Sequence, residues 1–291
     1  MGWPSGSRLT AGSCARWPTE GSLSDADDAV QEAWLRLSRL SSSDAGAIEN
    51  LEAWLRTAVS RLCLDILRTR TSRREEPLDW HAPACAAQDG DPEQEALLLD
   101  SVGRAMLVVL DALAPAERVA FVLHDLFAVP FDEIAPVVGR TPATAKKLAS
   151  RARLRVRGAP AVPRAELARQ RSVVEAFLAA ARSGDLDALL AVLAPDVVRR
   201  ADPAVLQPVL SGADAVARQT LVLGPRARFA EPALVNGMVG AVIAPHGRLQ
   251  LVLAVTVTGG RVAGYDVIAD PARLARLELA VLDGGNSGHP G

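Results

Sequence analysis

Apolar residues recur at helical spacing in two stretches near the start of the chain. The first set is Ala26, Ala29, Val30, Ala33, Trp34, Leu37 and Leu40, and the second is Leu51, Trp54, Leu55, Ala58, Val59, Leu62, Cys63, Ile66 and Leu67. Steps of three and four residues place each set on one face of a helix. The polar stretch SSSDAGAIEN separates the two sets. The pattern therefore predicts two antiparallel helices.

A second helical block follows a stretch without periodicity. The stretch PLDWHAPACAAQDGDPEQE contains three prolines, which favours a linker. Helical spacing then resumes at Leu98, Val102, Ala105, Met106, Val109, Leu110 and Leu113, and again at Val119, Val122, Leu123 and Leu126. Pro115 suits the first turn of the later helix. We expect two further helices here.

Residues 131–157, FDEIAPVVGRTPATAKKLASRARLRVR, have the order of a helix-turn-helix. The pattern predicts a short helix over 131–137, a tight turn at Gly139, and a second helix capped by Thr141. Pro136 removes one hydrogen bond from the first helix. The second helix is expected to expose Thr144, Lys146, Lys147, Ser150, Arg151 and Arg153.

Charge is concentrated on this segment although the chain is nearly neutral. The formal net charge is -2, yet seven Lys or Arg lie between positions 140 and 157, without an acidic residue. Such a helix fits the major groove of DNA, and the alternative is a solvated basic surface helix. Capping, the turn glycine and one-sided charge together favour DNA.

The C-terminal part of the chain changes to a mixed pattern. After the Pro/Ala stretch GAPAVPRAE, helical spacing at 167–182 and 185–193 precedes four strand-like runs. These runs are DVVRRA, ALVNGMVGAVIA, LQLVLAVTV and RVAGYDVI, with turn signals at His246-Gly247 and Gly259-Gly260. Helices followed by a meander indicate a separate α+β domain.

Composition excludes several classes of protein. A length of 291 residues allows two or three domains, and a hydrophobic fraction of 49% fits folded cores. Cys14, Cys63 and Cys85 form no close pair in the sequence. We therefore expect free thiols and a cytoplasmic location. The chain contains no apolar run of about 18 residues, so the sequence predicts no membrane span. The first twenty residues lack the apolar core of a secretory signal.

The order of these segments resembles a bacterial RNA polymerase sigma factor of the extracytoplasmic-function group with a C-terminal SnoaL-like, NTF2-type extension. The resemblance rests on DADDAVQEAWLRL, NLEAWLRTAVSRLCLDILRTRTSRRE and LAPAERVAFVLHDLFAVPFDEIAPVVGRTPATAKKLASRAR, and it covers about residues 21–280. It implies a multidomain fold: two all-α sigma domains, the second a helix-turn-helix, and an α+β cone domain. It also implies core RNA polymerase and promoter DNA as partners, with no cofactor, no metal and no membrane.

The resemblance also implies the domain boundaries. They are an atypical, disordered N-terminal segment at 1–20, a truncated region 2-like domain at 21–76, a linker at 77–94, a region 4-like helix-turn-helix domain at 95–157, a linker at 158–166, a SnoaL-like domain at 167–280 and a disordered tail at 281–291. Family members normally begin with another helix, which the segment MGWPSGSRLTAGSCARWPTE does not show.

Three sets of site residues follow from the same resemblance. The polymerase-binding set is Asp25, Asp28, Gln31 and Glu32; the set for the downstream promoter element is Arg56, Arg61, Arg68, Arg70, Arg73 and Arg74; the set for the upstream element is Thr141, Thr144, Lys146, Lys147, Ser150, Arg151 and Arg153. Basic side chains supply affinity for phosphates in both DNA-binding sets.

Two other functions compete with this interpretation. One is a helix-turn-helix regulator with a ligand-sensing domain. The other is an NTF2-like isomerase or hydrolase, for which the meander offers Asp266, Tyr265, Asn236 and His246. No paired carboxylates, Ser/His/Asp set or metal cluster is evident, so we expect no catalysis. We expect the C-terminal domain to regulate the sigma domains through an intramolecular contact.

Overall fold

The computed structural model describes residues 23–40, 48, 50–74, 103–202, 207–222 and 224–282. The expectations for 1–20, for the linker at 77–94 and for most of the tail lie outside these residues. The chain forms two compact units, one of residues Met1–Leu98 and Asp111–Arg153 and the other of Leu99–Leu110 and Leu154–Gly291. The boundary between the units therefore falls inside the expected helix-turn-helix domain.

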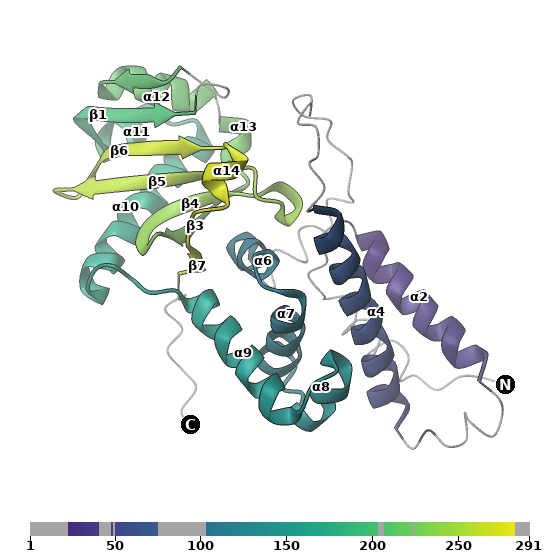
Figure 1. Cartoon of the computed structure of the whole chain (residues 1–291). Coiled ribbons are helices and arrows are strands. Elements are labelled where there is room, and N and C mark those ends of the chain that lie inside the picture. The colour runs from purple at the N-terminus through teal and green to yellow at the C-terminus, as the bar shows by residue number, and fades with distance from the viewer. Residues whose placement is uncertain are drawn as a thin grey trace. The chain divides into compact units, whose positions relative to one another are not determined.

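The first unit contains the two predicted N-terminal helices, α2 (Leu23–Ser38) and α4 (Leu51–Arg74), which pack side by side (Figure 1). The side-chain oxygen of Asn50 accepts a hydrogen bond from the amide of Ala53 at 3.0 Å, as a helix cap does. The buried stripe of α4 is Leu55, Val59, Cys63, Leu64 and Leu67. The apolar spacing predicted both helices correctly.

The helix-turn-helix is formed by α8 (Phe131–Val138) and α9 (Pro142–Arg157). Gly139 ends α8 with a left-handed φ of 66°, and the Thr141 hydroxyl accepts from the Thr144 amide at 3.3 Å. The helix ahead of them is divided into α7 (Pro115–Phe121) and a π-helical turn, η1 (Val122–Leu126). The predicted turn and cap are confirmed.

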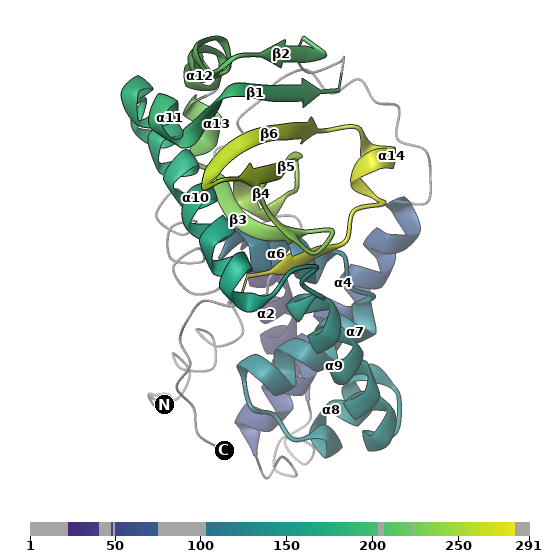
Figure 2. The same cartoon turned by 90° about the vertical axis from the view of Figure 1, so that its left-hand side faces the viewer.

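The second unit contains a seven-stranded sheet with the order β2-β1-β6-β5-β4-β3-β7 (Figure 2). The strands are β1 (Leu193–Ala201), β2 (Val209–Ser211), β3 (Ala230–Val235), β4 (Met238–Ile243), β5 (Leu251–Thr258), β6 (Arg261–Ile268) and β7 (Leu279–Val281). β1 and β6 are parallel, and the other neighbours are antiparallel. The expected α+β architecture is present.

Helices cover one face of this sheet and enclose the larger core. They are α10 (Arg164–Ser183), α11 (Leu186–Val192), α12 (Ala213–Val222) and α13 (Gly224–Ala227). Phe177, Leu189 and Val216 on these helices pack with the sheet residues Leu234 and Val255. The sequence analysis did not predict α12, although Val216, Ala217, Thr220 and Leu221 recur at helical spacing.

The opposite face of the sheet is covered by α6 (Arg104–Asp111), near the start of the expected helix-turn-helix domain (Figure 2). Ala105 on α6 is buried in a core with Ala233, Val235, Val242, Val252 and Ile268 of the strands. The short helix α14 (Pro271–Leu274) contributes Leu274 to the same core. In the structure, α6 thus belongs to the unit that contains the sheet.

The run ALVNGMVGAVIA forms two strands, not the single strand-like run that the sequence analysis expected. β3 and β4 pair from Val235 and Met238, so Asn236 and Gly237 form a two-residue turn. Their φ angles are 50° and 79°. A type I′ turn needs φ > 0 at both positions, which Asn-Gly tolerates best. The Asn236-Gly237 turn therefore explains why the run divides into two strands.

The stretch between α9 and α10 is attached to the sheet domain. The amide of Ala161 donates to the carbonyl of Gly237 at 2.8 Å. Gly158 has a φ of 61°, and an added Cβ there would lie 2.4 Å from the Cβ of Ala280. α10 begins at Arg164, three residues before the predicted helix. Because of these contacts, a side chain at Gly158 would displace the stretch from the sheet.

A buried carboxylate joins β1 to the end of β6. Asp202 is 7% exposed, and its side chain accepts from the amides of Ala269 and Asp270, both at 2.8 Å. It also pairs with the guanidinium of Arg273. Burial raises the pKa of Asp202, but the two amides and Arg273 outweigh it, and the pKa is lowered overall. The ionised carboxylate therefore stabilises the folded domain.

Replacing Asp202 by Asn should lower the free energy of unfolding of the C-terminal domain by about 1–3 kcal/mol at neutral pH, because charge-assisted hydrogen bonds are lost. A lowered folded-state pKa gives stability that is present above the unfolded value of about 3.9 and disappears as the pH falls through the folded value. Tyr265, the chain's single tyrosine, lies in this domain, so the tyrosine NMR resonances during urea unfolding measure the effect. Equal differences between wild type and variant at neutral and acidic pH would contradict this role of the charge.

Candidate nucleic-acid interface

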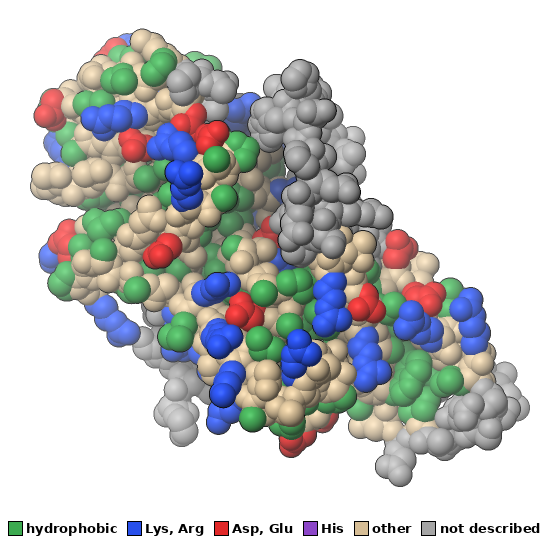
Figure 3. Space-filling view, viewed as in Figure 1, with side chains coloured by type: hydrophobic (Ala, Val, Ile, Leu, Met, Phe, Trp, Pro, Cys, Tyr) green, Lys and Arg blue, Asp and Glu red, His purple; other side chains and the backbone are tan. Residues whose placement is uncertain are grey.

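Helix α9 presents basic side chains on the side opposite its buried alanines. Ala145, Ala149 and Ala152 are fully buried, so they mark the inward face of the helix. Thr141, Lys146, Lys147 and Arg151 are exposed, and Thr144 and Ser150 are half-buried. Basic side chains gather along α9 on the face that Figure 3 shows. Exposed amines and guanidiniums on one helix face suit a phosphate backbone.

Arg153 differs from its exposed neighbours because it is paired within the protein. Its Nε donates to the Asp125 carboxylate at 2.8 Å, and one of its terminal nitrogens lies 2.6 Å from the same oxygen. Asp125 lies in the π-helical turn η1. This ion pair ties α9 to η1 in the first unit.

The arginines predicted for the downstream element are divided between two environments. The guanidinium of Arg56 pairs with Glu133, and that of Arg61 donates to the carbonyl of Pro136 at 3.2 Å, so both contact α8. Arg68 is exposed, 3.6 Å from Asp65. Arg70, Arg73 and Arg74 lie on the last turns of α4, and the description of the structure does not extend to their side chains.

The candidate polymerase-binding residues all lie on α2. Asp28 and Gln31 are exposed, while the carboxylate of Glu32 pairs with Arg36 at 3.0 Å, one helical turn later. Asp25 belongs to the first turns of the helix, and its side chain lies outside the described part. Asp28 and Gln31 are therefore accessible to a partner protein.

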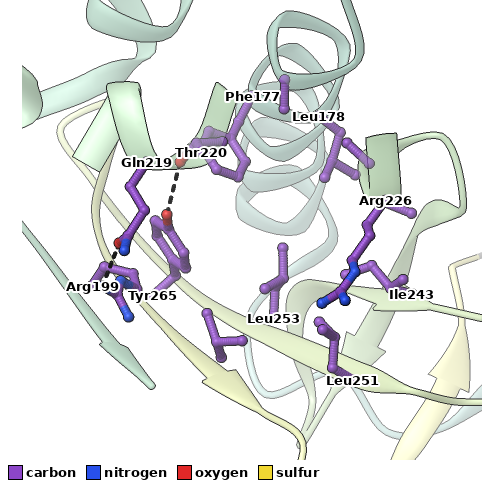
Figure 4. A pocket seen from close by; sticks show the side chains of 14 residues that line it. Phe177, Leu178, Arg199, Gln219, Thr220, Arg226, Ile243, Leu251, Leu253 and Tyr265 are labelled. Atoms are coloured by element: carbon purple, nitrogen blue, oxygen red, sulfur yellow. Dashed lines mark hydrogen bonds between the residues drawn. The ribbon is translucent and has the colours of Figure 1, made fainter. Parts of the chain in front are cut away.

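The residues considered for catalysis come from β6, which contains the consecutive Tyr265 and Asp266, and from two turns elsewhere in the C-terminal domain. Tyr265 lines a cavity of about 80 Å³, and its hydroxyl lies 3.0 Å from that of Thr220 (Figure 4). Asp266 is 3.9 Å from Arg200. Asn236 forms the β3–β4 turn, and His246 lies in the 3-10 helix η2 (Pro245–Gly247). Among the described side chains of Asn236, Tyr265 and Asp266, no hydrogen bond or ion pair joins any two.

Two cavity-lining residues were missed by the sequence analysis, Arg199 on β1 and Gln219 on α12. Arg199 is 1% exposed, and its guanidinium donates to the carbonyl of Gln207 at 2.7 Å and to the side chain of Gln219. Strand alternation within DVVRRA could have indicated that one of its two arginines faces inward. Gln219 was missed because α12 was not predicted.

The described residues contain neither a metal-binding cluster nor a membrane-spanning helix. No group of three or more His, Cys, Asp or Glu side chains there could hold a metal ion. None of the helices traced in the described ranges has the length and apolar character of a membrane span.

Comparison with protein families matches both helical segments. Residues 8–73 match the model described as Sigma-70 region 2, and residues 103–156 match Sigma-70, region 4. The helix-turn-helix, with the helical pair ahead of it, thus defines a sigma factor of the sigma-70 class.

Similar sequences show which group of sigma factors the chain belongs to. The chain is 36% identical over 274 residues to the "Probable ECF RNA polymerase sigma factor SigI" of Mycobacterium tuberculosis, covering 91% of each sequence. It is 38% identical over 282 residues to the "ECF RNA polymerase sigma factor SigJ" of the same species, covering 89% of this chain and 88% of that one. The crystal structure of SigJ aligns with a TM-score of 0.42 at 35% identity, over 92% and 94% of the two chains. The chain belongs to the ECF RNA polymerase sigma factors.

Replacing Lys147 and Arg151 together by Ala should weaken binding of promoter DNA by about tenfold or more and reduce the slope of log K against log salt by about two. The reason is that each exposed cation releases counterions when it meets a phosphate. Fluorescence anisotropy across a salt series measures both quantities.

A double variant with Arg218 and Arg276 replaced by Ala is the matched control, since it removes the same charge from exposed positions of the C-terminal domain. If affinity and slope stay at the wild-type values in the Lys147/Arg151 variant, α9 is not the DNA-binding helix.

Proposed function

We propose that this sigma factor binds core RNA polymerase through α2, contacts the downstream promoter element through α4 and the upstream element through α9, and is regulated by its own C-terminal domain. The observation that carries the proposal is the capped helix α9, whose Lys146, Lys147 and Arg151 are exposed, within a match to sigma-70 region 4. A helix that starts at a tight turn presents its early residues to base edges and its later ones to phosphates.

The role of α4 in the downstream element is assigned to its C-terminal turns. Arg56 and Arg61 contact α8, so they are engaged within the protein in this arrangement. Arg68, Arg70, Arg73 and Arg74 follow at the other end of the helix. A cluster of arginines supplies the electrostatic affinity that melted, single-stranded DNA requires.

Transcription in vitro with purified core polymerase on a library of genomic promoter fragments tests the function. We expect discrete transcripts only when the chain and core polymerase are both present, and their loss with the Lys147/Arg151 variant. Specific DNA binding that does not need core polymerase, without transcripts, would favour the helix-turn-helix regulator instead.

Regulation by the C-terminal domain is supported by the position of α6. The region 4 match begins at residue 103, yet α6 packs on the sheet of the second unit. The carboxylate of Glu231 on β3 accepts from the amides of Arg104 and Ala105 at the start of α6. Since these amides have no partner within the helix, Glu231 acts as its cap. A change in the sheet domain would therefore be felt by a segment of the DNA-binding region.

Replacing Glu231 by Ala should lower transcription from a cognate promoter, by up to about fivefold, because loss of a helix cap costs about 1 kcal/mol. Glu231→Gln keeps an acceptor oxygen and should restore part of the activity. Transcript yield at matched protein amounts measures the effect, with exposed Glu278→Ala as the control. Unchanged transcription in Glu231→Ala would contradict the coupling, and a rise would reverse its sign.

An enzymatic role of the C-terminal domain is not part of the proposal. The residues that line its cavity include no Asp, Glu, His, Cys or Ser among those described. General acid–base and nucleophilic catalysis rely mainly on such groups. We assign the protein to the cytoplasm, where core RNA polymerase and promoter DNA are found. Turnover of a substrate by the full chain would reopen the isomerase or hydrolase alternative.

A further inference from the structure

The C-terminal domain contains a cavity of about 80 Å³ between its helices and the sheet (Figure 4). On this scale one water molecule needs about 10–15 Å³, so the cavity has room for a group of several heavy atoms. Its walls are mostly apolar, with Phe177 and Leu178 from α10 facing Ile243, Leu253 and Val267 from the strands. A hydrocarbon group fits these walls.

One wall of the cavity carries a buried positive charge. The guanidinium of Arg199 is bonded to two neutral acceptors, the carbonyl of Gln207 and the side-chain oxygen of Gln219. These bonds use two of the five N–H groups of a guanidinium. No described carboxylate forms an ion pair with Arg199, and no acidic residue lines the cavity. A buried charge without a counter-charge is unfavourable, so the site favours an anion.

Two neighbouring groups add to this preference. Burial raises the pKa of Tyr265, although the Thr220 hydrogen bond and the charge of Arg199 oppose the shift, so the hydroxyl stays protonated and can donate. Arg226 on α13 lines the other side of the cavity, and its side chain is exposed (Figure 4). The cavity therefore has a cation at its buried side and another at its solvent-facing side.

We propose that this cavity binds a small organic carboxylate, whose carboxylate group pairs with Arg199 and the Tyr265 hydroxyl and whose hydrocarbon part packs against Phe177 and Leu253. Guanidinium and carboxylate match in shape and form parallel charge-assisted hydrogen bonds. The apolar walls disfavour inorganic phosphate, because they would leave most of its oxygens without partners. The binding site does not depend on how the domain affects transcription.

The test uses the full chain and a panel of carboxylates, the straight-chain acids from butyrate to octanoate and benzoate, each paired with its neutral amide. Tyr265 is the chain's single tyrosine, so a shift of the tyrosine NMR resonance during titration reports binding in the cavity. We expect at least one carboxylate to bind with a Kd of about 1 mM or tighter and its amide to bind at least about tenfold more weakly.

Variants test the charge of Arg199 and the volume of the cavity separately. Arg199→Gln should weaken carboxylate binding by about tenfold or more. Arg200→Gln is the matched control, because the side chain of this neighbour on β1 is 63% exposed and points to the opposite face of the sheet. Leu253→Trp keeps Arg199 but fills the cavity, and should abolish binding.

Three results would overturn the proposal. They are the absence of a shift with every member of the panel up to about 10 mM, equal affinity for acids and amides, and wild-type affinity in Arg199→Gln. If Arg199→Gln does not fold, the acid–amide comparison in the wild type and the Leu253→Trp variant decide the question.

Discussion

The centre of the sheet in the second unit is apolar on both faces, and this constraint decides which segments fold with it. In β3 and β4, consecutive residues are buried, including Ala233, Leu234 and Val235, so both faces of the sheet centre are apolar. A sheet of this kind needs cover on both sides. Helices α10–α13 cover one face, and α6 with α14 covers the other. Because the cap from Glu231 also fixes the start of α6, this helix is as much a part of the C-terminal domain as of the sigma segment.

This arrangement explains why boundaries drawn along the chain differ from those of the compact units. The region 4 match covers 103–156, but residues 99–110 and 154–291 cluster together in space. Burial of apolar surface decides which segments fold together, whatever their order in the chain. The stretch after α9 behaves in the same way, since Gly158 and Ala161 contact the sheet domain. Two segments that flank the helix-turn-helix in sequence therefore belong to the unit that contains the sheet.

Local chemistry made much of the fold predictable. Gly139, Thr141 and Pro142 specified the turn and the second helix, because each acts on its own backbone. The Asn236-Gly237 turn was equally local and could have been predicted. The contacts of Asp202, Arg153 and Arg199 could not, since each joins positions whose proximity depends on the tertiary fold. The sequence therefore indicated which residues were basic, but the structure was needed to show which of them are engaged within the protein.

That distinction decides how much of the positive charge is available to DNA. Between positions 140 and 157 the sequence holds seven basic residues, but Arg153 is neutralised by Asp125. A pair with a fixed carboxylate releases few counterions on binding DNA, so it adds little to the salt dependence. Lys146, Lys147 and Arg151 remain exposed to solvent, so their charge is not neutralised by a carboxylate in the way that the charge of Arg153 is. Arg199 lies at the opposite extreme: it is excluded from solvent and from DNA, and only a molecule small enough to enter the domain can meet its charge.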